Sequence, residues 1–145
     1  MSVHAIEAEA MFRRIAERCD LSLVRDDDED APLFTLTTKD GAGDPVTLGL
    51  QNTDELTFSV GAFWASFFPY ETVQGLFEKA VLGWFGGQTR LACHWRGRKL
   101  VRIDMQVRLK HGAWQRIYTE YLTWRLPILS FRTTYRTHTA PDPSL

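Results

Sequence analysis

The chain has 145 residues, of which 44% are apolar, 12% aromatic and 24% charged. This balance is typical of one globular domain, and it excludes a wholly disordered chain, a collagen and a coiled coil. The net charge of −1 is unevenly distributed. Residues 1–80 carry six Lys or Arg and fifteen Asp or Glu, a net of −9, whereas residues 81–145 carry eleven and three, a net of +8.

Cysteine usage and the N-terminus indicate a compartment. Cys19 and Cys93 are too few for a disulfide framework, and both sit at apolar positions, so we expect buried free thiols. The first ten residues contain Glu7 and Glu9 and lack the basic and apolar regions of a signal peptide. The most apolar stretch, residues 60–70, is about half the length that spans a bilayer. We therefore expect a soluble cytoplasmic protein that does not bind membranes.

The first half of the chain predicts one helix and four strands. Apolar residues recur every three or four positions over residues 3–19, which favours an amphipathic helix capped by Ser2. Strands are expected over residues 20–25, 32–38, 46–51 and 55–60. The acidic run Asp26–Asp30 joins the first two strands, and we expect it to be solvated and mobile because its carboxylates repel one another.

The second half predicts one helix and four more strands. An aromatic connection over residues 61–69 precedes a helix over residues 70–85, which Gly86 and Gly87 end. Strands are expected over residues 90–96, 99–110, 114–124 and 128–135, and residues 137–145 read as a flexible tail. The strand over 99–110 alternates most clearly, with Val101, Ile103 and Met105 on one face.

These elements predict an α+β fold in the order α-β-β-β-β-α-β-β-β-β. Short turns favour antiparallel pairing, so we expect a two-layer domain over residues 1–136. Its curved, mainly antiparallel sheet would have about seven or eight strands, packed by the two helices.

No pattern in the sequence identifies a reaction. His4, His94, His111 and His138 have no metal-ligand spacing, and the acidic run lacks the alternating ligands of a calcium loop. Glycine pairs do not follow the phosphate-loop or dinucleotide spacing, and no nucleophile elbow is present. We therefore predict no catalytic residue, no metal and no cofactor, and we lean against an enzyme.

Two groups of residues are candidate binding surfaces. If the alternation holds, one exposed sheet face is basic, and Trp114 and Tyr118 share a face with Arg116. Its predicted basic residues are Arg90, His94, Arg96, Arg102, Arg108 and Lys110, with Arg116, Arg132 and Arg136 as possible extensions. The second group is the aromatic connection, where Trp64, Phe67 and Phe68 would anchor a partner if exposed. If buried, they cover the core.

Three functions remain open on these residues. The first is a non-catalytic binding or protein-interaction module, including self-association through the two oppositely charged surfaces. The second is a protein or enzyme that binds an acidic or aromatic small molecule in a pocket between sheet and helices. The third, which the near-neutral total charge disfavours, is binding of single-stranded nucleic acid on the basic face.

Overall fold

A computed structural model describes residues 2–26, 31–123 and 132–139 of the chain. The chain divides into two compact units, residues 1–82 and 83–145. The boundary falls within the helix α2 (Tyr70–Gly86), close to its C-terminal end. Our expectation of a single domain over residues 1–136 stays a prediction.

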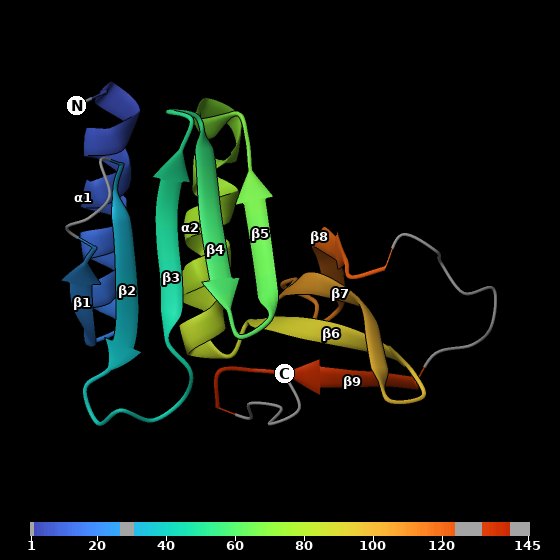
Figure 1. The fold of residues 1–145 in the computed structure, drawn as a ribbon. Coiled ribbons are helices and arrows are strands. Elements are labelled where there is room, and N and C mark those ends of the chain that lie inside the picture. The colour runs from blue at the N-terminus through green and yellow to red at the C-terminus, as the bar shows by residue number, and fades with distance from the viewer. Residues whose placement is uncertain (1, 27–30, 124–131, 140–145) are drawn as a thin grey trace. The chain divides into compact units, whose positions relative to one another are not determined.

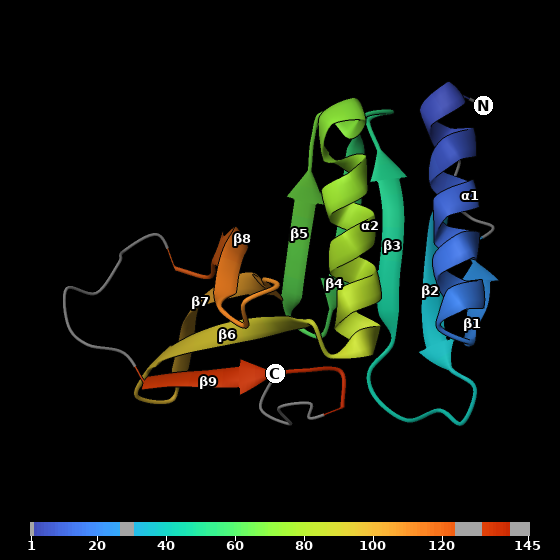
Figure 2. The same cartoon turned by 180° about the vertical axis from the view of Figure 1, so that it is seen from behind.

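The first unit is an antiparallel sheet covered by helices. It begins with α1 (Val3–Arg18), which Ser2 caps by accepting a hydrogen bond from the backbone N–H of Ala5. The strands β1 (Leu21–Arg25), β2 (Leu33–Thr38), β3 (Val46–Gln51), β4 (Glu55–Val60) and β5 (Phe63–Phe67) follow and pair in chain order. Figure 1 shows these strands side by side, and Figure 2 shows α1 and α2 over one face of the sheet.

Aromatic side chains hold the helices on that face. Phe12 of α1 lies 5.9 Å from the Phe34 ring of β2 and 6.3 Å from the Phe77 ring of α2. The Phe77 ring also meets Phe67 of β5 at 5.6 Å, edge to face. Phe12, Phe34 and Phe77 are fully buried. Burial of these rings stabilises the packing of the helices on the sheet.

The second unit is a four-stranded antiparallel sheet, formed by β6 (Thr89–Arg96), β7 (Lys99–Arg108), β8 (Trp114–Tyr121) and β9 (Arg132–Arg136). The strand order is β8-β7-β6-β9, so the last strand returns to pair with β6. One face carries Leu91, Cys93, Ile103 and Met105, all fully buried. The clear alternation of the sequence therefore corresponds to a sheet with one buried face.

The predicted fold class is confirmed, with two differences in detail. The described residues form nine strands in two sheets, whereas we expected one sheet of seven or eight strands. The additional strand is β5, which we had read as a connection. In β5, Phe63, Ala65 and Phe67 are buried while Trp64 is exposed. Aromatic residues on both faces hid this two-residue period in the sequence.

Some expectations fall outside the described residues. They concern residues 27–30 of the acidic run, residues 124–131, which include parts of the last two predicted strands, and residues 140–145 of the predicted tail. Cys93 is a buried free thiol, as expected, and Cys19 is a half-buried free thiol. Neither helix in the described part of the chain is long and apolar enough to cross a membrane.

Candidate functional site

The candidate site is one face of the four-stranded sheet in the second unit. Successive side chains of a strand point to opposite faces, so the pairing register shows which residues share a face. Arg90 pairs with Gln106, and His94 pairs with both Arg102 and Thr133. We call this surface the cationic face. It comprises Arg90 and His94 of β6, Arg102, Asp104, Gln106 and Arg108 of β7, Trp114, Arg116, Thr119 and Tyr121 of β8, and Thr133 and Tyr135 of β9.

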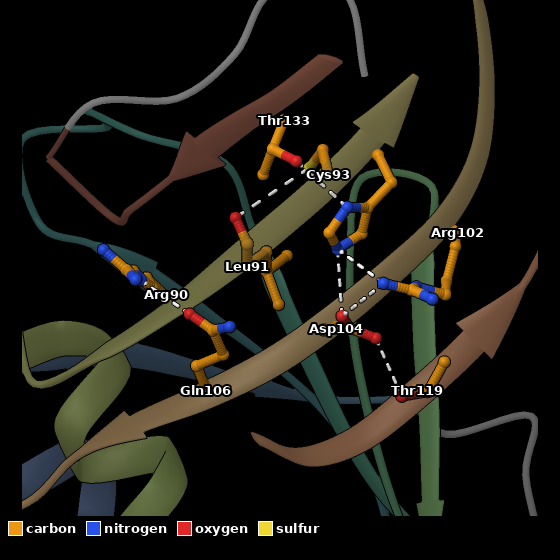
Figure 3. Close-up of polar contacts among 9 residues, drawn as sticks. Arg90, Leu91, Cys93, Arg102, Asp104, Gln106, Thr119 and Thr133 are labelled. Atoms are coloured by element: carbon orange, nitrogen blue, oxygen red, sulfur yellow. Dashed lines mark hydrogen bonds and ion pairs between the residues drawn. The ribbon is translucent and has the colours of Figure 1, made fainter. Parts of the chain in front are cut away.

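Arg90 is held by aromatic rings from two other strands of the sheet. Its guanidinium carbon lies 4.2 Å from the centre of a Trp114 ring and 3.9 Å from that of Tyr135. Its Nε donates to Oε1 of Gln106 at 2.7 Å, the contact drawn in Figure 3. Burial lowers the pKa of Arg90, but a guanidinium stays protonated at neutral pH. The rings therefore fix a positive charge in place.

A second cluster on the same face surrounds Asp104, whose side chain is only 5% exposed. Its Oδ2 lies 2.9 Å from Nε2 of His94 and 3.3 Å from an Nη of Arg102. Its Oδ1 accepts a hydrogen bond from the Thr119 hydroxyl at 2.8 Å, as Figure 3 shows. The other ring nitrogen of His94, Nδ1, lies 3.1 Å from Oγ1 of Thr133. This network links all four strands of the sheet, and it neutralises Arg102.

Three other arginines of this sheet differ from Arg102. Arg108 and Arg116 are exposed, and so is Arg96 at the end of β6. None of these three, nor Arg90, forms an ion pair with a carboxylate of the described residues. Because Asp104 is the one carboxylate of the cationic face and already pairs with Arg102, the face keeps a positive charge.

Three residues expected on this face lie elsewhere. A register shift between Met105 and Gln106 pairs Tyr118 with Met105, so Tyr118 lies on the opposite face from Arg116. The extra residue of such a bulge reverses the alternation beyond it. Arg132 and Arg136 pair with Trp95 and Leu91 and also lie on the opposite face. Arg136 is 1% exposed, and Arg132 lies over the Trp95 ring.

The aromatic connection lies in the first unit and does not act as one surface. Phe63, Phe67 and Tyr70 are buried, while Trp64 is 44% exposed and Phe68 63% exposed. Phe67 therefore packs in the core. Of the three residues that we singled out, Trp64 and Phe68 are accessible to a partner.

Sequence reasoning missed several residues of the cationic face. Tyr135 and Thr133 come from a strand whose pairing with β6 leaves no local signal in the sequence. In a simple alternation the odd residues Thr119 and Tyr121 would lie on the opposite face from the even residues Trp114 and Arg116, and only the bulge brings them to this face. The burial of Asp104 was also missed, because it depends on contacts with His94 and Thr119 from the two neighbouring strands.

The network contains a carboxylate, an imidazole and a hydroxyl in the order that activates nucleophiles. Asp104, His94 and Thr133 form this series, with the contacts given above.

The described residues contain no metal-binding cluster. His4 and His111 lie in other elements, and among residues 2–26, 31–123 and 132–139 no three His, Cys, Asp or Glu side chains form a group that could hold a metal ion.

No family model, no curated protein and no solved structure matches the chain.

Proposed function

We propose that the chain is a non-catalytic binding module that docks an acidic protein partner on its cationic face. The observation that carries this proposal is Arg90, a guanidinium restrained by Trp114 and Tyr135 and without an ion-pair partner in the described part of the chain. A restrained arginine loses little side-chain entropy when it binds a carboxylate. Exposed Arg108 and Arg116 add positive charge beside it.

The composition of the face favours a protein over a nucleic acid. Protein interfaces are enriched in Arg, Tyr and Trp, and Tyr121 and Tyr135 are each more than half exposed. Nucleic-acid binding would use aromatic faces to stack bases, but the Arg90 guanidinium already covers rings of Trp114 and Tyr135.

The proposal is tested by titrating a fluorescein-labelled deca-glutamate peptide and labelled deca-thymidylate, with fluorescence anisotropy as the readout. We expect the peptide to bind at low salt and to bind at least about tenfold more weakly when the salt is raised to a physiological level, because salt screens charge pairs. The double substitution Arg108→Glu and Arg116→Glu should abolish binding. Its matched control is Arg18→Glu and Lys79→Glu, which makes the same change in net charge at exposed positions of the first unit.

Each outcome of this titration bears on the proposal. Loss of binding in the double variant, with binding retained in the control, supports it. Equal losses in both would show that net charge alone attracts the peptide, and would overturn the role of the face. Tighter binding of deca-thymidylate than of the peptide would replace the protein partner with single-stranded nucleic acid.

A second candidate function is an esterase or acyl transferase that uses the Thr133 hydroxyl. The chain from Asp104 through His94 to Thr133 favours it, because an imidazole next to a hydroxyl can remove its proton during attack on a carbonyl. Incubation with p-nitrophenyl acetate tests it. Acetylation of Thr133, detected by mass spectrometry and absent in His94→Gln, would favour this function over the binding module. Hydrolysis unaffected by His94→Gln would reject it.

A further inference from the structure

The strand β8 forms one edge of the four-stranded sheet. The strand order is β8-β7-β6-β9, so β7 lies on one side of β8 and, in the described part of the chain, no strand pairs with its other side (Figure 1). None of the eight residues of β8 is buried, whereas β7 buries five of ten. β8 also contains no Lys or Pro, which commonly prevent further pairing at an edge. Its outer edge is therefore a place where another extended chain can pair.

Backbone hydrogen bonds at the two ends of β8 show which of its residues point to β7. The carbonyl of Ala113 accepts a hydrogen bond from the N–H of Leu109 at 2.7 Å. The N–H of Leu122 donates to the carbonyl of Val101 at 3.0 Å. Ala113 and Leu122 therefore direct their backbone groups toward the chain of β7. Along an antiparallel strand, such residues alternate with residues whose N–H and C=O groups point the other way.

The outward-pointing residues of β8 are the same ones that contribute side chains to the cationic face. Counting inward from each end of the strand, they are Trp114, Arg116, Thr119 and Tyr121. Directly paired residues of antiparallel strands place their side chains on the same face of the sheet. Every second side chain of a chain added at this edge would therefore lie on the cationic face.

A bulge divides this outer edge into two segments. The extra residue, Ile117, interrupts the regular alternation, so a straight chain pairs fully on only one side of it. In the second segment, Thr119 donates its hydroxyl to Asp104, whose carboxylate already neutralises Arg102. This segment offers no unbalanced positive charge, so an acidic chain is expected at the first segment.

The first segment, residues 114–116, lies among arginines. Arg116 is exposed, and the guanidinium carbons of Arg90 and Arg108 lie 4.2 and 5.9 Å from the centre of a Trp114 ring. None of these three arginines forms an ion pair with a carboxylate of the described residues. The other edge strand, β9, contributes only uncharged residues to the cationic face, and its arginines lie on the opposite face. Charge therefore favours β8 over β9.

We infer that the acidic partner binds as an extended peptide that adds an antiparallel strand to β8 at residues 114–116. The inference rests on the proposed function, since it names the form in which an acidic partner is recognised. The peptide carries Asp or Glu at every second position, because those side chains lie beside the three arginines. At the same positions its backbone groups pair with those of Trp114 and Arg116, and the side chains between them need not be acidic.

The test uses fluorescein-labelled decapeptides in which threonine and glutamate alternate: the parent, a form N-methylated at every glutamate and a form N-methylated at every threonine. The two methylated forms have the same composition and charge. Methylation at glutamate removes the N–H groups that point to β8, whereas methylation at threonine removes those that point away. With the full chain at low salt and up to about 1 mM, the glutamate-methylated form should bind at least about tenfold more weakly than the threonine-methylated form, because backbone hydrogen bonds are lost.

Two further measurements locate the contact. The parent peptide should slow hydrogen exchange of the Trp114 and Arg116 amides, while the amides of β9 should exchange at unchanged rates. Arg116→Gln should weaken binding of the parent peptide at least about threefold. Its matched control is Gln115→Glu, which makes the same change in net charge at the neighbouring exposed position, on the opposite face of β8, and should weaken binding less.

The outcomes separate this inference from the proposed function. If neither the alternating peptides nor deca-glutamate binds at low salt, both fail. If deca-glutamate binds and the parent peptide does not, or if the two methylated forms bind equally, the proposed function stands and strand addition is overturned. Tighter binding of the glutamate-methylated form overturns the antiparallel register. Slowed exchange at β9 instead of at Arg116 overturns the assignment to β8.

Discussion

Replacement of Asp104 by asparagine is expected to destabilise the second unit strongly. The carboxylate is almost fully buried and contacts His94, Arg102 and Thr119 at 2.9, 3.3 and 2.8 Å. Asparagine has the same shape and can still accept the Thr119 hydrogen bond. Its amide nitrogen, however, would face the donor groups of Arg102, and the charge that balances the guanidinium would be lost.

The magnitude follows from the type of contact that is removed. Removing one partner of a buried ion pair costs about 3–5 kcal/mol. Arg102 is 22% exposed and can be partly rehydrated, so we place the cost of Asp104→Asn at about 2–3 kcal/mol. For a unit of this size, each kcal/mol lowers the melting temperature by about 4–8 °C.

Urea unfolding, followed by tryptophan fluorescence, measures the change in the free energy of unfolding. The control is Glu17→Gln, which neutralises an exposed carboxylate of α1 and should change stability by less than about 0.5 kcal/mol. A double-mutant cycle of Asp104→Asn with Arg102→Met should give a coupling of at least about 1 kcal/mol. A cost for Asp104→Asn as small as that of the control would refute the network.

Three further predictions test other parts of the structure. Arg90→Met should reduce the free energy of unfolding by about 1–2 kcal/mol, because contacts with two rings and the Gln106 hydrogen bond are lost. In a Trp114→Leu background this reduction should be smaller, and an equal reduction would argue against the contact between Arg90 and the Trp114 ring. Gly75→Ala should stabilise the protein by about 0.5–1 kcal/mol, since an added Cβ meets no other atom within 4 Å. Gly83→Ala in the same helix should destabilise it by about 1–3 kcal/mol, because the Cβ would lie 2.4 Å from Oγ1 of buried Thr89. Thermal melts in which both substitutions change stability in the same direction would contradict the packing at Gly83. The pKa of His4 is raised by its hydrogen bond to the Thr53 carbonyl and by Glu71. The protonated ring therefore stabilises the fold below pH about 6.5, and this contribution is lost as pH rises through the raised pKa. His4→Gln should remove that pH dependence, and a variant whose stability follows the wild type from pH 5 to 8 would disprove the assignment.

The sequence predicts those parts of the fold that have a local cause. Both helices and eight of the strands follow from apolar periodicity and from Gly or Asp in the turns, and the inward face of β7 is correct at each alternating position from Val101 to Val107. The strand β5 was not predicted, because aromatic residues occupy both of its faces. The division into two sheets was not predicted, because strand pairing is decided by long-range packing, which no local residue pattern specifies.

The candidate site was predicted in part for the same reason. Arg90, His94, Arg102 and Arg108 share the expected face because they lie on strands with regular alternation. Tyr118 lies on the opposite face, since one bulge residue reverses the alternation of side chains along the strand. The contact of Arg90 with Tyr135 joins residues 45 positions apart in β6 and β9, and only the register of that pairing brings them together.

The most direct test of the cationic face is a map of amide chemical shifts by NMR while an acidic peptide is added. The account predicts that the shifts concentrate on β6, β7 and β8 around Arg90, Arg108 and Arg116, and that they disappear in Arg90→Met. Shifts that lie mainly on residues 1–82, or a spectrum unchanged by the peptide at low salt, would contradict it.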